Sequence, residues 1–299
     1  MAGNDFDRSN PTARFSEQLD YATCKTWGDS IKPNPISINF PPRKVNTTPA
    51  LEVSHLTVVR SGKTILEDIN LEVKTGEFVG IVGPNGSGKS TLALSVLGFL
   101  KVQNGTIRIL EQKPLSKKLN GKIGWVPQAA SNLPTDLKIT VEELVMLGTV
   151  NSKNMFFWPN AERKSRVKTA IEKVGLETDS KTDVSKLSGG QRQRAVIAKA
   201  LASNAEFIVL DEPLVGIDKE TRNSLLKLLD NLCHDEGKTI LMISHDITAM
   251  CQTAHRIIYL EEGIRFDGPS SEFPDFSLLA EIRGIVQVHE GAKEIKEEE

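Results

Sequence analysis

The sequence is poor in aromatic residues and cysteines, and it lacks a long apolar run. Aromatic side chains make up 5% of its 299 residues, so aliphatic side chains must fill the core. Cys24, Cys233 and Cys251 are scattered and odd in number, which gives neither a metal-ligand spacing nor a plausible disulfide framework. We therefore interpret them as reduced thiols of a cytosolic protein.

Membrane-inserting segments are also missing from the sequence. No apolar run approaches the roughly 20 residues that a membrane-spanning helix needs. Asp5, Asp7 and Arg8 interrupt the start of the chain, where a secretion signal would need an apolar stretch. The formal net charge of -2, without a basic stripe, gives no field that would attract a nucleic-acid backbone. We expect a chain that is soluble by itself, binds no nucleic acid and meets a membrane only through a partner.

Composition divides the chain into a central region and two polar ends. Residues 1–48 are polar, with prolines gathered near their end, and are predicted to form a mostly disordered arm. Residues 286–299 end in a charge run and are predicted to be a solvated tail. Residues 49–285 carry the apolar periodicity and are predicted to form one domain, since they contain no internal repeat of domain size.

Apolar spacing in this central region predicts an α/β fold with a mainly parallel core sheet. Unbroken apolar strands separated by helices are typical of a parallel sheet covered on both faces. Two hairpin-like stretches add an N-terminal antiparallel β subdomain, and spacings of three and four predict a helical subdomain at about 130–190. The predicted hairpins pair 51–58 with 65–73 and 105–110 with 123–126; core strands cover 78–82, 207–210 and 240–243; helices cover 90–100, 141–148, 167–174 and 219–232.

A glycine-rich loop joins the predicted strand at 78–82 to the predicted helix after it. It matches the strand–GxxxxGK[ST]–helix motif in its required context, whereas glycines alone would also suit a tight turn. Glycines let backbone amides turn toward phosphate oxygens, and the helix N-terminus adds a positive dipole end. Lys89 can then reach the β- and γ-phosphates of ATP, and the Ser90 hydroxyl can ligate Mg²⁺. The predicted ATP-binding residues of this phosphate-loop NTPase are Gly83, Pro84, Asn85, Gly86, Ser87, Gly88, Lys89, Ser90 and Thr91.

Two carboxylates follow the apolar strand at 207–210. The carboxyl end of a strand faces the ligand crevice in doubly wound sheets. Asp211 is therefore placed to hold Mg²⁺, and Glu212, one residue further on, to polarise the attacking water. Taken alone, either acid could instead cap a turn before Pro213.

The segment at 187–191 reads Leu-Ser-Gly-Gly-Gln and precedes a helical pattern. We call it the signature segment. Backbone amides at a helix N-terminus bind anions, and the Ser188 hydroxyl adds a donor. A glycine pair before a helix could equally be a flexible entry.

At this point the sequence resembles the nucleotide-binding subunits of ABC transporters. The resemblance covers about 51–268, and its six motifs occur in the family's order. They are the phosphate loop, Gln128 after a strand, the signature segment, Asp211 with Glu212, Asp218 in a loop, and His245 after a strand.

The resemblance implies roles for these residues. Gln128 would contact Mg²⁺ and the lytic water, His245 would hold the γ-phosphate and the water beside Glu212, and Asp218 would communicate across a dimer. A lone histidine after a strand is more often a packed or capping residue. The signature segment of a second copy would bind ATP in trans through Ser188, Gly189, Gly190 and Gln191.

Two features depart from the family's usual pattern. Family members usually place an aromatic ring against adenine, where this sequence has Arg60. A guanidinium can stack on a base, but Arg60 could equally be a solvated turn residue. Phe156, Phe157 and Trp158 could contact a membrane partner or pack locally over the helix pair.

The resemblance implies an ATP-hydrolysing subunit of a transporter that imports a substrate across a membrane. The residues at 126–128 and 140–148 look most like the branch that imports zinc, manganese and iron chelates. Implied partners are transmembrane permease subunits, a second copy of the chain and an extracytoplasmic solute-binding protein. The chain would then lie on the cytoplasmic side of the cell membrane, held there by the permease.

Other classes of ABC ATPase remain as alternatives. A DNA-repair member would need a long coiled coil between Lys89 and Ser188, where no sustained heptads occur. A translation-associated member would carry two modules and a basic surface. A regulatory ATP sensor without turnover is disfavoured by the presence of Glu212.

Overall fold

The chain folds around two sheets of different kind, and the computed structural model describes residues 48–128, 138–151, 154, 159–203 and 205–274. All of these up to residue 273 belong to one unit. The arm predicted at 1–48 lies outside the described residues except for Thr48, and so does the tail predicted at 286–299. The Phe156, Phe157 and Trp158 cluster also lies outside them.

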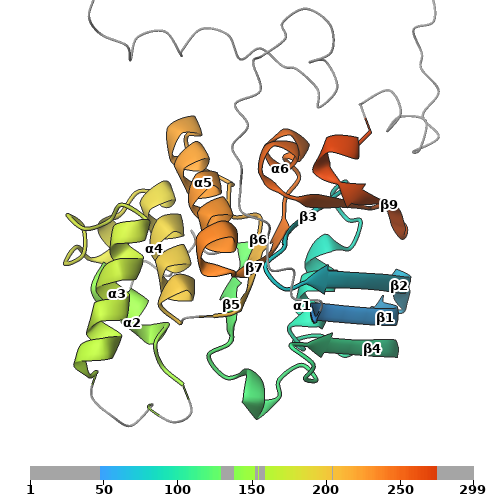
Figure 1. Cartoon of the computed structure of the whole chain (residues 1–299), viewed down its shortest axis with the longest axis horizontal. Helices are drawn as coiled ribbons and strands as arrows, with labels where there is room; N and C mark the ends of the chain where they lie inside the picture. The colour runs from blue at the N-terminus through green and yellow to red at the C-terminus, as the bar shows by residue number, and fades with distance from the viewer. Residues whose placement is uncertain (1–47, 129–137, 152–153, 155–158, 204, 275–299) are drawn as a thin grey trace, which may run out of the picture. The chain divides into compact units, whose positions relative to one another are not determined.

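An antiparallel sheet of three strands forms from the first apolar segments. β1 (Pro49–Arg60) is its centre, with β2 (Lys63–Lys74) on one edge and β4 (Asn104–Ile109) on the other. Residues of alternating burial, such as Leu51 and Val53, give the sheet one inward face. All three strands contact α1 (Lys89–Val96). The expected N-terminal antiparallel sheet is therefore confirmed (Figure 1).

The second predicted hairpin is wrong. β4 joins the antiparallel sheet, whereas β5 (Ile123–Val126) pairs in parallel with β6 (Phe207–Asp211) at the edge of the core sheet. The connection between β4 and β5, which contains η1 (Lys117–Leu119), crosses from one sheet to the other. Apolar alternation identified both segments as strands, but it does not specify which strand each one pairs with.

The core sheet has the order β5-β6-β7-β3-β8-β9. Its remaining strands are β3 (Phe78–Val82), β7 (Thr239–Ile243), β8 (Arg256–Leu260) and β9 (Ile264–Pro269), which leads into η4 (Ser270–Glu272). Among the strands that the structure describes in this sheet, only β9 runs antiparallel to its neighbour, which confirms the mainly parallel core.

The register of the core sheet determines which loops meet. Every residue of β3, β6 and β7 is buried, which explains their unbroken apolar runs. Ile243 of β7 is level with Ile81 of β3 on one side and with Asp211 of β6 on the other. The loops that follow these three strands therefore begin side by side at one edge of the sheet.

Three helices pack together beside β5. They are α2 (Val141–Leu147), α3 (Ala161–Lys173) and α4 (Gly189–Ala202), drawn from green to yellow in Figure 1. Thr140 begins α2 with a capping box, which satisfies backbone amides at the first turn. Among the described residues, no helix has the length and apolar character needed to cross a membrane.

The helix after the phosphate loop is shorter than its apolar pattern predicts. We expect it over 90–100, but α1 ends at Val96, with Leu97 as its C-cap. Gly98 has φ +78°, and a Cβ there would lie 2.9 Å from atoms of Pro114 and Leu115. A left-handed glycine in close contact with another segment ends the helix, although the apolar residues continue to Leu100.

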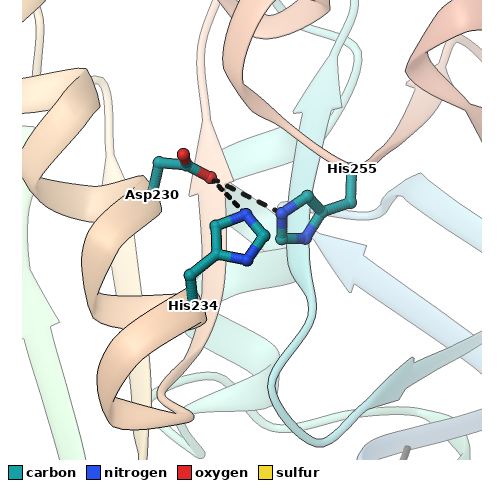
Figure 2. Close-up of side chains that lie close together, drawn as sticks. All are labelled: Asp230, His234 and His255. Atoms are coloured by element: carbon teal, nitrogen blue, oxygen red, sulfur yellow. Dashed lines mark ion pairs between the residues drawn. The ribbon is translucent and has the colours of Figure 1, made fainter. Parts of the chain in front are cut away.

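A polar cluster holds the end of α5 (Lys219–Glu236) close to the sheet. Asp230 Oδ1 lies 3.2 Å from Nε2 of His234 and 3.6 Å from Nε2 of His255 (Figure 2). The backbone N–H of Phe78 donates to Nδ1 of His255 at 2.9 Å. Neutral His255 must therefore carry its proton on Nε2, the atom that faces Asp230. A metal cation could bind Nε2 of His255 only if that atom carried no proton. We therefore interpret the cluster as a polar junction between α5 and β3.

Candidate active site

The loop at 83–90 takes a conformation that requires glycine at two of its positions. Gly83 has φ +152°, and a Cβ there would lie 2.2 Å from the carbonyl oxygen of Leu260. Gly88 has φ +97°, and a Cβ there would lie 2.7 Å from Cδ2 of Leu66. The loop thus passes tightly between β8 and β2, and α1 begins at its end with amides that point back into it.

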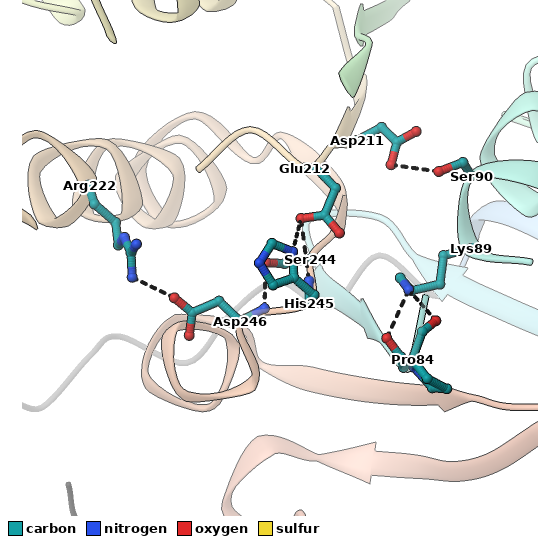
Figure 3. A network of polar contacts seen from close by, with 10 residues as sticks. Pro84, Lys89, Ser90, Asp211, Glu212, Arg222, Ser244, His245 and Asp246 are labelled. Carbon is teal, nitrogen blue, oxygen red and sulfur yellow. Dashed lines mark hydrogen bonds and ion pairs between the residues drawn. The ribbon is translucent and has the colours of Figure 1, made fainter. Parts of the chain in front are cut away.

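Lys89 lies folded over this loop. Its Nζ donates to the carbonyl oxygens of Gly83 and Pro84, each at 2.8 Å, and the residue is 6% exposed (Figure 3). Burial lowers the pKa of Lys89, while the negative charges of Glu212 and Asp211 act in the opposite direction. A phosphate oxygen could replace either carbonyl as the acceptor and would stabilise the ammonium further.

Ser90 and Asp211 meet across the gap between α1 and β6. The Ser90 hydroxyl donates to Oδ1 of Asp211 at 3.1 Å, and Asp211 is 4% exposed. Burial raises the pKa of the Asp211 carboxyl, against the effect of the hydrogen bond from Ser90. A hydroxyl and a carboxylate oxygen this close are the hard donors that Mg²⁺ prefers, so this pair fits the ion.

Glu212 and His245 form the second polar pair of the site. Oε2 of Glu212 lies 2.8 Å from Nδ1 of His245 and 3.4 Å from its backbone nitrogen. Glu212 is buried and has φ +51°, a conformation that costs a glutamate on the order of 1 kcal/mol. Its own N–H donates to the carbonyl of Ile243, which fixes the turn after β6. The structure therefore places a carboxylate next to Asp211, with an imidazole directed at it.

Three further residues position the loop that carries His245. The backbone N–H of Asp246 donates to the Ser244 hydroxyl, and the Asp246 carboxylate pairs with Arg222 of α5 (Figure 3). The same carboxylate accepts from the N–H of Ala249 and so begins α6 (Ile247–Thr253). We did not predict these residues. An aspartate directly before a short helix is a capping signal that could have identified Asp246.

Asp218 and Ser188 both occur as N-caps. Asp218 accepts from the N–H of Thr221 at the start of α5, and this hydrogen bond lowers the pKa of its carboxyl. Ser188 accepts from the N–H of Gln191, while the Gln191 side chain accepts from the N–H of Ser188. This capping box begins α4, so the signature segment occupies a helix N-terminus as its pattern predicts.

Gln128 and Arg60 lie on exposed parts of the chain. Gln128 comes two residues after β5, directly before residues outside the described part of the chain. Arg60 ends β1 at the turn to β2. That hairpin borders the phosphate loop, because Ile65 and Leu66 would touch a Cβ placed on Gly88. Both assignments, as a Mg²⁺ and water contact and as an adenine-stacking residue, stay predictions.

Comparison with known proteins gives concordant results. The family described as ABC transporter matches residues 66–215. The zinc uptake system ATP-binding protein ZurA of Listeria innocua is 35% identical over 237 residues, covering 79% of this chain and 92% of that protein. The manganese transport system ATP-binding protein MntB of the same species is 37% identical over 219 residues, covering 73% of this chain and 90% of that protein.

Two solved structures resemble the fold closely. CbiO1 of Clostridium perfringens, part of the ABC transporter complex cbiONQ, has a TM-score of 0.67 at 30% identity, covering 79% of this chain and 94% of that one. The dimeric structure of a bacterial ABC transporter cassette has a TM-score of 0.66 at 31% identity, covering 75% of this chain and all of that one. At 30% and 31% sequence identity, both structures resemble this chain in sequence as well as in fold.

Proposed function

The chain belongs to the ABC transporter family, and from that premise we propose that it hydrolyses ATP to drive import of a metal ion or metal chelate. One observation carries the enzymatic part of this proposal. The polar side chains of the site converge at the edge where β3, β6 and β7 end; they are Lys89, Ser90, Asp211 and the Glu212–His245 pair. This convergence supports one site that binds phosphates, holds a cation and activates water.

ATP would bind with its phosphates against the loop amides and Lys89. The lysine would exchange its bonds to the Gly83 and Pro84 carbonyls for bonds to phosphate oxygens. Ser90 and Asp211, with Gln128, would hold Mg²⁺, which supplies charge to neutralise the developing negative charge on phosphate. The buried position of this site keeps those electrostatic interactions strong.

Glu212 would polarise the attacking water. Its carboxylate is held on one side by the His245 ring and backbone, which orients it without using its second oxygen. That second oxygen would accept a proton from water as it attacks the γ-phosphate. With Nδ1 of the His245 ring facing Glu212, its exposed Nε2 would bond the γ-phosphate and so hold that phosphate beside the water.

A second copy of the chain would complete the site. The signature segment of each copy would meet the ATP of the other through Ser188, Gly189, Gly190 and Gln191, with Asp218 at the same interface. A two-fold arrangement presents the same surface on both subunits, which suits one module per chain. The dimeric structure of a similar cassette supports this assembly.

The relatives' names support the choice of cargo. They describe zinc uptake, manganese transport and chelated iron transport systems. In such a system the chain would dock on permease subunits at the cytoplasmic face of the membrane, with an extracytoplasmic solute-binding protein delivering the cargo. Gln128 and the helices α2 and α3 would carry the motion of ATP-driven closure to the permease.

The Glu212→Gln variant tests the ATP-clamped dimer. We expect the purified variant to dimerise with ATP and Mg²⁺ by light scattering, and to stay monomeric with ADP. A variant that remains monomeric at saturating ATP contradicts the composite site. Cargo is tested separately by reconstituting the chain with its permease in vesicles and measuring ATP-dependent uptake of Zn²⁺ and Mn²⁺.

A further inference from the structure

The side-chain amide of Gln191 makes hydrogen bonds at both of its ends. Its Oε1 accepts from the backbone N–H of Ser188 at 2.9 Å, and its Nε2 donates to Oδ2 of Asp179 at 3.1 Å. A backbone N–H can only donate and an ionised carboxylate can only accept, so these partners fix which end of the amide is which. Gln191 thus joins the signature serine to an acid that lies outside the signature segment.

Asp179 itself sits in a turn closed by backbone hydrogen bonds. Its N–H donates to the carbonyl of Leu176, and its carbonyl accepts from the N–H of Thr182 at 2.8 Å. The turn continues into η3 (Val184–Lys186), which Asp183 begins as N-cap. The carboxylate that holds Gln191 is therefore fixed in place by the backbone around it.

The same turn is bonded to the beginning of α2. The N–H of Glu142 donates to the carbonyl of Ser180 at 2.9 Å, and the N–H of Val141 donates to the carbonyl of Thr182 at 3.1 Å. The N–H of Val184 donates to the carbonyl of Ile139 at 2.9 Å. A continuous set of hydrogen bonds thus runs from the start of α2, through the turn at 176–184, to Asp179 and the start of α4.

We propose that Asp179 is a positioning residue: it holds the Gln191 amide as a brace for Ser188 and ties the signature segment to the start of α2. Gln191 then serves the trans site by orienting Ser188 and the first amides of α4, in place of the direct contact with ATP that the resemblance implies for it. A displacement of the start of α2 would move the signature segment with it. The inference rests on the proposed function, because it assigns a role within the composite ATP site.

Removing the Asp179 carboxylate tests this role. In the Glu212→Gln background, the readout is the dimer dissociation constant at saturating ATP, from light scattering over a series of protein concentrations. Without the Asp179 brace, Ser188 is held less well for the partner's ATP, and we expect each signature contact to weaken by about fivefold, the scale of one ordinary hydrogen bond. Because a two-fold dimer contains the contact twice, Asp179→Ala should raise the dimer dissociation constant by about 25-fold.

A charge exchange separates bracing from direct ligation. Gln191→Glu can still accept from Ser188, but it sets a second carboxylate against Asp179 and should also weaken dimerisation. Adding Asp179→Asn supplies an amide that donates to the new carboxylate, so the double variant should recover dimerisation to within about threefold of the parent. If Gln191 contacted nucleotide directly, the added charge would harm the dimer whatever residue stood at position 179.

A neighbouring acid provides the matched control. Glu177 is exposed and lies two residues before Asp179, so Glu177→Ala removes the same charge from the same turn and should dimerise like the parent. Binding of a fluorescent ATP analogue to dilute monomer should be unchanged in every variant. Dimerisation of Asp179→Ala equal to that of the parent, or no recovery in the double variant, overturns the inference. A parent that never dimerises overturns the composite site itself.

Discussion

Nδ1 of His245 lies 2.8 Å from Oε2 of Glu212, so an exposed ring is set directly against a buried carboxylate. The His245 side chain is 61% exposed and that of Glu212 is 7% exposed. The ring therefore covers the carboxylate at the rim of the site, and the backbone N–H of His245 approaches the same oxygen. We therefore expect the two side chains to act as one unit, in which the imidazole orients the group that would activate water.

The first prediction concerns this pair. Glu212→Gln should lower the rate of phosphate release by at least about 100-fold, because an amide cannot accept the proton of water. His245→Ala should lower it by a smaller factor, because the carboxylate remains but is no longer oriented. The double variant should match Glu212→Gln, since members of one catalytic unit are not additive. A loss in the double variant equal to the product of both single losses would contradict this unit.

Most of the candidate site could be predicted from the sequence, because its residues follow the ends of predicted strands. The loop at 83–90 and the acids Asp211 and Glu212 each follow an unbroken apolar run, and parallel register then places them at one edge. Pairs that are distant in sequence left no such pattern. Two such pairs are Arg222 with Asp246 and Asp179 with Gln191. Their residue types are common on protein surfaces, and only the packing of α5 and α4 brings each pair together.

The errors in the predicted fold have a related cause. Apolar spacing predicted the strands at 105–110 and 123–126 but not their partners, because pairing depends on the path between them. The end of α1 depends on Gly98 touching Pro114 and Leu115, a contact between segments that local spacing cannot express. Local periodicity thus indicates what an element is, and tertiary contacts decide where it stops and what it meets.

The second prediction ranks two cations of the nucleotide site. Lys89→Ala removes a buried ammonium that donates to the loop and would bond phosphates, so ATP affinity should fall by at least about 100-fold. Arg60→Ala removes an exposed guanidinium that is predicted at most to stack on adenine, so its effect should be at least about tenfold smaller. Titration of a fluorescent ATP analogue measures both variants. Equal losses would show that the ranking is wrong.

The third prediction separates close contact from backbone strain in the phosphate loop. Gly83→Ala places a Cβ 2.2 Å from a backbone oxygen, so the loop must move and stability should fall by at least about 3 kcal/mol. Gly86→Ala meets open space and carries only the cost of φ +84°, about 1 kcal/mol. Urea unfolding followed by circular dichroism compares them. A similar loss in both would mean that strain, rather than contact with Leu260, makes glycine necessary at Gly83.

The fourth prediction follows from the raised pKa of Asp211. Because the folded state binds this proton more tightly than the unfolded state, stability falls as pH rises from the ordinary aspartate value to the raised one. Asp211→Asn does not titrate, so it should unfold at a higher temperature than wild type at pH 7, while ATP hydrolysis is lost. The difference in Tm should shrink as the pH falls below about 4. A Tm difference that stays constant with pH would exclude burial of the Asp211 charge as its cause.

The last prediction concerns the junction of Asp230, His234 and His255. His255→Phe keeps a ring of similar width but removes the acceptor for the N–H of Phe78, at the first residue of the strand that leads to the phosphate loop. Leaving that backbone donor without its partner should lower the free energy of unfolding by about 1–3 kcal/mol. His234→Phe, on the exposed side of the same cluster, is the matched control and should cost less.

Stoichiometric Co²⁺ should give no tetrahedral absorption band with the wild-type chain, because Nε2 of His255 carries the proton. A strong band that His255→Phe abolishes would instead show that the ring releases Phe78 and turns the junction into a metal site.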